Sequence, residues 1–96
     1  MSFWVYMLQC ADDSYYVGHT ENLDIRIRQH NSRQVGGYTA SRLPVKLVFS
    51  QDHPTREDAL SAERRIKGWS RAKKEALIRG DWAEISRLAK SRSRGI

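Results

Sequence analysis

The sequence predicts an α/β fold, in which a small central sheet of three strands, mixed or antiparallel, is flanked by helices on both faces. Two short runs near the start, residues 3–9 and 15–19, are rich in aromatic and β-branched side chains, which favour strands. Both runs are almost continuously apolar, which indicates a sheet covered on both faces. From residue 55 onward the apolar positions instead recur three and four residues apart, the spacing of amphipathic helices.

The first half of the chain is expected to form a hairpin, a helix, a loop and a third strand. The two strand-like runs should pair in antiparallel fashion because Asp-Asp-Ser between them provides turn residues. Thr20 can cap a short helix over residues 22–31. Residues 32–45 contain a Gly-Gly pair and a proline and are typical of an irregular loop with one helical turn. Residues 46–51, KLVFSQ, predict the third strand.

Three further helices are marked by capping residues at their starts and glycines near their ends. The first begins with TRED, a capping box in which aspartate takes the place usually held by glutamate. The expected bounds are about 55–67, ended or bent by Gly68; 70–78, ended by Gly80; and 81 to about 90, capped by DWAE.

The length of 96 residues fits one domain, which we expect over residues 1–90, followed by a disordered basic tail at 91–96. No apolar run approaches the roughly 18 residues that a membrane span needs, and the first ten residues lack the features of a signal peptide. The single Cys10 excludes an internal disulfide and a cysteine zinc cluster. We therefore expect a cytoplasmic protein without a membrane partner.

The net charge of +6 is confined to the C-terminal half. Residues 1–55 hold five basic and five acidic side chains, which cancel, whereas residues 56–96 hold twelve basic and six acidic ones. Residues 64–74, RRIKGWSRAKK, carry six positive charges and no negative charge. This asymmetry indicates a polyanionic partner, most often nucleic acid, although a purely solubilising helix face would have the same composition.

Glu63 stands out because it falls within an apolar helical stripe. At 100° per residue, Ala59, Ala62, Ile66 and Trp69 share one face, and Glu63 lies inside its angular span. Burying an ionised carboxylate costs several kcal/mol unless it is paired or binds a metal. Glu63 therefore either reaches out to solvent, pairs with a nearby arginine or holds a metal ion.

Four other polar or aromatic residues are ambiguous when taken alone. Tyr6 and Tyr16 lie in neighbouring strands, where a tyrosine usually packs its ring and wets its hydroxyl. Arg26 and His30 are four positions apart on the first helix and project side by side, as solvated surface pairs also do. Taken together in this order along the chain, and followed by Glu63, they indicate a functional site.

These elements resemble the GIY-YIG nuclease domain, especially its small stand-alone bacterial members. Residues 4–6 align with the Gly-Ile-Tyr element and residues 16–18 with the Tyr-Ile-Gly element. Arg26 in RIRQHN aligns with the helix arginine and Glu63 in AERRIKGW with the glutamate, and the YT dipeptide followed by Pro44 lies between them. The resemblance covers about residues 3–78. Tryptophan replaces the first glycine, and a histidine, residue 19, stands where similar domains often have a small hydroxyl residue.

The resemblance implies a metal-dependent nuclease with a role for each aligned residue. Glu63 would hold one Mg²⁺ or Mn²⁺ ion by a single carboxylate. Arg26 would bind a nonbridging phosphate oxygen with its fork of donors. Tyr6 would be the general base for water, which requires its pKa to be lowered, and Tyr16 and His30 would orient the water or relay a proton.

A basic surface beside this site would bind the backbone of nucleic acid, with DNA favoured over RNA. Contacts to phosphate carry little base information, so we expect weak sequence selectivity and a preference for branched, nicked or single-stranded ends. The expected binding residues are Tyr38, Arg42 and Lys46 on one side and Arg64, Lys67, Arg71, Lys73 and Lys74 on the other.

Two alternatives stay open at this point. The chain could be a binding module of the same fold that holds nucleic acid without cutting it, such as a repair or ribosome accessory protein, or a nuclease that works only with a protein partner. The full set of Tyr6, Tyr16, Arg26 and Glu63 favours an enzyme, because a pure binder does not need it. The sequence does not predict the oligomeric state.

Overall fold

A computed structural model of the chain describes residues 2–34 and 36–94. Its elements follow the predicted order of strand, strand, helix, loop, strand and helices. They are β1 (Phe3–Gln9), β2 (Tyr15–Thr20), α1 (Leu23–Asn31), the 3₁₀ turn η1 (Gly37–Thr39), β3 (Lys46–His53), α2 (Arg56–Lys67), α3 (Arg71–Arg79) and α4 (Trp82–Arg94).

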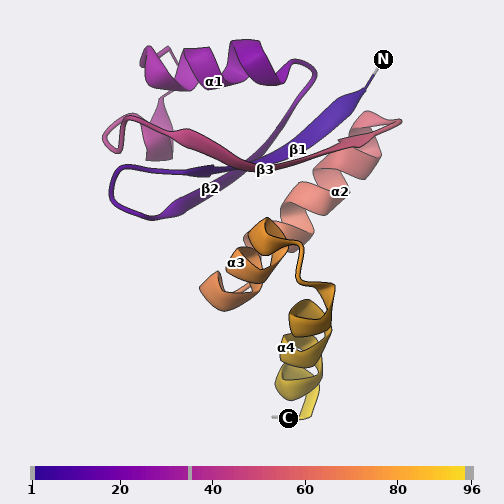
Figure 1. The fold of residues 1–96 in the computed structure, drawn as a ribbon. Coiled ribbons are helices and arrows are strands. Elements are labelled where there is room, and N and C mark those ends of the chain that lie inside the picture. Colours follow the sequence, from indigo (N-terminus) through magenta and orange to yellow (C-terminus); the bar gives the residue numbers. More distant parts are fainter. Residues whose placement is uncertain (1, 35, 95–96) are drawn as a thin grey trace.

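The three strands form one sheet in the order β2-β1-β3. Both pairs are antiparallel, so the antiparallel form of the prediction is confirmed over the described residues. In the β1–β2 pair Tyr6 lies opposite Gly18 and Val5 lies opposite His19. Figure 1 shows α1 on one face of this sheet and α2 on the other. The α/β fold with helices on both faces is therefore confirmed.

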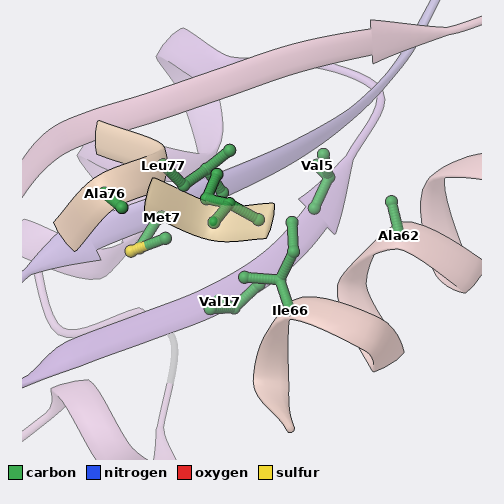
Figure 2. Packing of buried hydrophobic residues seen from close by; sticks show 8 residues of the cluster. Val5, Met7, Val17, Ala62, Ile66, Ala76 and Leu77 are labelled. Carbon is green, nitrogen blue, oxygen red and sulfur yellow. The ribbon is translucent and has the colours of Figure 1, made fainter. Parts of the chain in front are cut away.

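Two buried clusters occupy the two faces of the sheet, because alternate residues of β1 point in opposite directions. Val5 and Met7 point toward α2 and α3, and Figure 2 shows this cluster. Tyr6 and Leu8 point toward α1. The first cluster consists of Val5, Met7, Val17, Ala62, Ile66, Ala76, Leu77 and Ile85, and the second of Tyr6, Leu8, Cys10 and Val45 with Tyr16, Leu23, Ile27 and Leu43 beside them.

The helix caps mostly follow the predicted residues. The Thr55 side chain accepts a hydrogen bond from the Asp58 N–H at 3.1 Å, which confirms Thr55 as the cap of α2. The cap of α1 is Asn22 instead of the predicted Thr20: its Oδ1 accepts from the Ile25 N–H at 3.1 Å. The Thr20 hydroxyl instead accepts from the N–H of Asn22, the capping residue itself, at 3.2 Å. Either side chain can cap a helix, so the sequence alone did not separate them.

β3 and α4 extend furthest beyond their predicted ends. β3 extends to His53 instead of residue 51, because Trp4 and Phe3 of β1 provide pairing partners for Asp52 and His53. α4 runs to Arg94, whereas the sequence predicted a helix end near residue 90 and a disordered tail from 91. No glycine or proline stands within residues 82–94 to end the helix earlier. Residues 95–96 of that predicted tail lie outside the described residues.

No helix within the described part of the chain is both long enough and apolar enough to span a membrane.

Candidate active site

An aromatic cluster forms where β1, β2 and α1 meet. The ring centroids of Tyr6 and Tyr16 are 6.3 Å apart, and the His30 ring lies 6.1 Å from the first and 5.3 Å from the second. Tyr6 and His30 are buried, with 2% and 1% of their surface exposed, whereas Tyr16 is half-buried. Three of the predicted site residues are thus brought together on the face of the sheet that α1 covers.

A chain of hydrogen bonds connects Tyr6 through His30 to the loop before β3. The Tyr6 Oη lies 3.1 Å from the His30 Nε2, and the His30 Nδ1 lies 2.8 Å from the Thr39 Oγ1. Burial lowers the pKa of His30, and the Arg26 guanidinium lowers it further. The neutral imidazole can therefore accept the Tyr6 O–H at Nε2 and donate from Nδ1 to Thr39.

The pKa of Tyr6 is raised, which is the opposite direction from the one that the sequence prediction required. Burial is the largest cause, and the Tyr16 and Glu63 side chains add to it. The Arg26 guanidinium lowers the pKa but does not outweigh these effects. Tyr6 is therefore a neutral phenol that donates a hydrogen bond, and it needs an acceptor before it can take a proton from water.

The residue after His30 fastens the loop that carries Thr39. The Asn31 Oδ1 accepts from the Val45 N–H at 2.8 Å, and its Nδ2 donates to the Val45 carbonyl at 3.2 Å. The backbone N–H of Arg42 also donates to the Thr39 carbonyl at 3.0 Å. The adjacent residues His30 and Asn31 of α1 thus hold the loop at two points, Thr39 and Val45. These contacts keep Thr39 beside His30.

Glu63 projects from α2 on the other face of the sheet, and its carboxylate has two partners. The His19 Nδ1 lies 2.6 Å from its Oε1, and the Lys67 Nζ lies 3.0 Å from its Oε2. Burial raises the pKa of Glu63, but hydrogen bonds from His19 and Lys67 outweigh burial, so the pKa is below its usual value. Glu63 is consequently an ionised, largely buried carboxylate.

A cleft of about 350 Å³ lies at the end of β2 and is lined by residues of both α1 and α2. His19, which holds Glu63, lines it together with Arg26 and Gln29 of α1 and Arg56 of α2. The Nε of Arg26 is buried and has no hydrogen-bond partner. Arg26 and Arg56 together give this cleft two guanidinium groups, so the cleft is suited to an anion.

The donor set beside this cleft fits one divalent cation. Within residues 2–34 and 36–94, no group of three or more His, Cys, Asp and Glu side chains could hold a metal. Glu63 does not itself line the cleft, but it supplies one ionised carboxylate next to the imidazole of His19, which does. A hard cation that keeps several of its waters needs one or two protein ligands of this kind.

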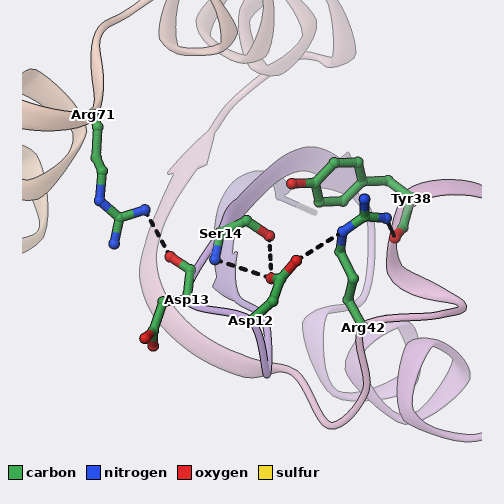
Figure 3. Close-up of polar contacts among 6 residues, drawn as sticks. All are labelled: Asp12, Asp13, Ser14, Tyr38, Arg42 and Arg71. Atoms are coloured by element: carbon green, nitrogen blue, oxygen red, sulfur yellow. Dashed lines mark hydrogen bonds and ion pairs between the residues drawn. The ribbon is translucent and has the colours of Figure 1, made fainter.

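Several of the predicted nucleic-acid-binding residues have partners within the protein. Figure 3 shows Arg42 and Arg71 on the two sides of the β1–β2 turn. The Arg42 Nε donates to the Asp12 carboxylate at 3.0 Å, and its guanidinium lies 3.9 Å from the centre of the Tyr38 ring. Arg71 donates to the Asp13 carbonyl at 2.7 Å. These two arginines therefore also hold the turn in place.

The remaining predicted binding residues are distributed along α2, α3 and the start of β3. The break predicted at Gly68 is confirmed, because α2 ends at Lys67 and α3 begins at Arg71. The Lys73 Nζ lies 4.4 Å from the centre of a tryptophan ring at position 69. Lys46 and Arg64 are exposed, Lys74 is half-buried, and Tyr38 is 43% exposed with its ring stacked on Tyr16.

Sequence reasoning missed three residues that help to build the site. Thr39 was only part of the YT motif, and nothing in the sequence indicated its contact with His30. Arg56 was read as part of a capped helix start, although it lines the cleft and donates to Glu21 at 2.7 Å. His19 was singled out as a departure from the family pattern, but not as the partner of Glu63. Its alternation with Val17 on β2 could have indicated that it faces α2.

The chain matches known proteins over most of its length. Residues 2–76 match the family model described as the GIY-YIG catalytic domain. A UPF0213 protein of Streptococcus pneumoniae is 41% identical over 75 residues, which cover 78% of this chain and 76% of that protein. The UPF0213 protein HQ_3675A of Haloquadratum walsbyi is 42% identical over 74 residues, covering 77% of this chain and 83% of that protein.

Two solution NMR structures are similar to this fold. The UPF0213 protein BH0048 from Bacillus halodurans has a TM-score of 0.53 and 41% identity, covering 81% of this chain and 83% of that chain. The protein EF2693 from E. faecalis has a TM-score of 0.58 and 32% identity, covering 83% and 85%. GIY-YIG proteins are endonucleases that act on nucleic acid and generally use divalent metals. Because the family model spans the sheet, α1, α2 and the residues of the cleft, this chain belongs to the GIY-YIG family.

Proposed function

We propose that this chain is a metal-dependent, structure-selective endonuclease that hydrolyses phosphodiester bonds with low sequence specificity and uses one metal ion. The observation that carries the proposal is a cleft lined by Arg26 and Arg56, whose wall includes His19, the partner of the ionised Glu63. Positive groups that can bind an anion thus stand close to a negative group that can hold a cation. A phosphodiester with its counter-ion satisfies both.

The arginines of the cleft would bind the scissile phosphate. Arg26 lines the cleft, and the planar fork of a guanidinium matches two phosphate oxygens better than an ammonium group does. Arg56 lines the same cleft and is 60% exposed, so its side chain can turn from Glu21 toward a second phosphate oxygen. Negative charge that grows on the phosphate in the transition state would be stabilised there.

Glu63 would hold one Mg²⁺ or Mn²⁺ ion. Lys67 is half exposed and lies one helical turn from Glu63, so its ammonium group can leave the carboxylate when a divalent cation arrives. When bound, the ion neutralises charge on the phosphate and stabilises the leaving oxygen. Glu63 itself would fix that charge on the α2 side of the cleft.

The proton from the attacking water would pass through Tyr6 to His30. Tyr6 cannot act as a base alone, because its raised pKa keeps the phenol protonated. Its Oη lies 3.1 Å from the Nε2 of His30, and burial keeps that imidazole neutral and able to accept a proton. The phenol can therefore give its own proton to His30 while it takes one from water. Tyr16, which packs against both rings, would position them.

The basic surface would bind the nucleic-acid backbone, with DNA as the proposed substrate over RNA. Arg64, Lys73 and Lys74 have no acidic partner among the described ion pairs and lie on α2 and α3. Since such contacts go to phosphate, the shape of the substrate and not its sequence would decide where cleavage occurs. We also propose that residues 1–90 act as one domain in the cytoplasm, where a lone Cys10 stays reduced.

The test is a cleavage assay with purified protein on flap, nicked, single-stranded and duplex DNA and on matched RNA, with and without Mg²⁺ or Mn²⁺. Metal-dependent cleavage that favours particular DNA structures is the expected result. Binding without cleavage, even with metal, would identify a nucleic-acid-binding accessory module instead. Cleavage that appears only after a cell extract is added would identify a nuclease that needs a protein partner.

A further inference from the structure

We propose that His19 is a second protein ligand of the metal ion, so that the ion is held by the His19 Nδ1 together with Glu63 and prefers Mn²⁺ to Mg²⁺. This inference rests on the proposed metal-dependent function. It adds a residue to the site, because the aligned family pattern implied one carboxylate and treated position 19 as a departure.

The distance between the two groups is close to what a shared cation requires. The His19 Nδ1 and the Glu63 Oε1 are 2.6 Å apart. Two adjacent ligands of an octahedral ion with bonds of about 2.1 Å lie roughly 3 Å apart. In the hydrogen-bonded pair these two atoms point at each other, so both side chains must rotate slightly, and Nδ1 must lose its proton, before their lone pairs face one ion. The pair then has to separate by only a few tenths of an ångström.

The backbone holds His19 in the position that this role needs. It lies on β2 opposite Val5, a fully buried residue of the central strand, so the main chain is fixed by the sheet. The side chain is 31% exposed and lines the cleft that contains Arg26. An ion at this point would face both solvent and the phosphate site, which leaves room for its waters.

The other two histidines do not compete for the ion. His30 is buried and uses both ring nitrogens on Tyr6 and Thr39. His53 ends β3 and lines a different hollow, together with Trp69 and Trp82. His19 is thus the imidazole that accompanies Glu63. An imidazole ligand suits transition metals better than Mg²⁺, which prefers oxygen, so it shifts the preference of the site toward Mn²⁺.

Pulsed EPR of the whole chain loaded with Mn²⁺ alone tests this directly, because a directly bound imidazole gives modulation from its ¹⁴N nucleus. The wild-type protein should show this modulation, and His19→Gln should lose it. His53→Gln is the matched control and should retain it. Titration calorimetry should show Mn²⁺ affinity falling at least about tenfold in His19→Gln, with a smaller loss for Mg²⁺, since even outer-shell changes cost that much.

The outcomes separate this inference from the proposed function. Bound Mn²⁺ and retained cleavage without ¹⁴N modulation in the wild-type protein would overturn the role of His19 and leave the nuclease proposal standing. Modulation that persists in His19→Gln would also overturn it. If the protein neither binds Mn²⁺ nor cleaves any substrate, both proposals fail. The wild-type spectrum is decisive by itself, even where His19→Gln folds poorly.

Discussion

The hydroxyl of Tyr6 lies directly over Gly18 of the neighbouring strand. A Cβ atom at position 18 would be 2.6 Å from the Tyr6 Oη and 2.7 Å from its Cζ, closer than such atoms approach in proteins. The two residues are paired in the β1–β2 register, so the contact is set by the sheet itself. Because Gly18 has no side chain, the ring of Tyr6 has room to lie against the backbone at this position.

We predict that Gly18→Ala destabilises the protein by about 1–3 kcal/mol, the range for forcing an extra methyl group into a packed core. Tyr6 would have to move, and its hydrogen bond to His30 would lengthen, so turnover should fall as well. Urea denaturation and a cleavage assay measure the two effects. Gly36→Ala is the control, because nothing lies within 4 Å of a Cβ at that position. Equal stability of the two variants would contradict the contact.

The sequence predicted the fold well because its signals are local. The apolar runs, the turn residues and the capping residues each act within a few positions, and they placed the strands and α1 to α3. The choice between Thr20 and Asn22 as a cap failed because two adjacent residues offered the same chemistry. The end of α4 was misjudged for a similar reason, since polar residues permit a helix as well as a tail.

The candidate site was only partly predictable, because its details depend on contacts between distant segments. The burial of Glu63 was expected from its place in an apolar stripe, with an arginine as one possible partner, but the partners are Lys67 and His19, which is 44 residues away in the sequence. The raised pKa of Tyr6 follows from burial by α1, which the strand pattern does not reveal. Charge counts likewise did not show that Arg71 holds the β1–β2 turn.

His30 should make stability depend on pH. Burial and the nearby Arg26 put its pKa in the folded protein below its ordinary value of about 6.5. The unfolded chain therefore takes up the proton first as the pH falls, so the folded state is stabilised fully above about pH 6.5 and loses this as the pH falls toward the folded pKa. The slope from one proton is at most about 1.4 kcal/mol per pH unit. Denaturation from pH 8 to 5 should show a shallower slope for His30→Gln; an identical slope would mean that His30 titrates normally.

Glu63→Gln should abolish cleavage and weaken Mn²⁺ binding while leaving nucleic-acid affinity unchanged or higher. The amide keeps the size of the side chain but removes the charge that a divalent cation needs. Calorimetry with Mn²⁺, a cleavage assay and a binding titration measure the three effects. The protein should remain folded, because Lys67 is half exposed and can turn to solvent. A loss of several kcal/mol in unfolding free energy would instead identify Glu63 as a structural ion-pair member.

Arg26→Lys should lower turnover by roughly 10² or more, the scale for losing one preorganised donor. Lysine keeps the positive charge but has no Nε donor in the buried position that lacks a partner in the protein. Substrate affinity should change little, since charge is conserved. Single-turnover cleavage and a binding titration at equal salt separate the two effects. Full activity of the lysine variant would show that the fork of donors is not used.

The basic residues of α2 and α3 should determine how binding depends on salt. Each phosphate contact to duplex contributes a slope of about 0.9 in a plot of log affinity against log salt concentration. Lys67 is paired with Glu63 and Arg71 with Glu75, so these two displace fewer counter-ions when nucleic acid binds.

Changing Lys73 and Lys74 to Gln, in contrast, should lower the slope by about one to two units and weaken binding alike for all sequences. Turnover at saturating substrate should persist, because these groups bind the ground state and the transition state equally. Arg87→Gln on α4 is the matched control, since Arg87 is paired with Glu84 and carries the same charge. If the double variant has the wild-type slope, Lys73 and Lys74 do not contact the nucleic-acid backbone.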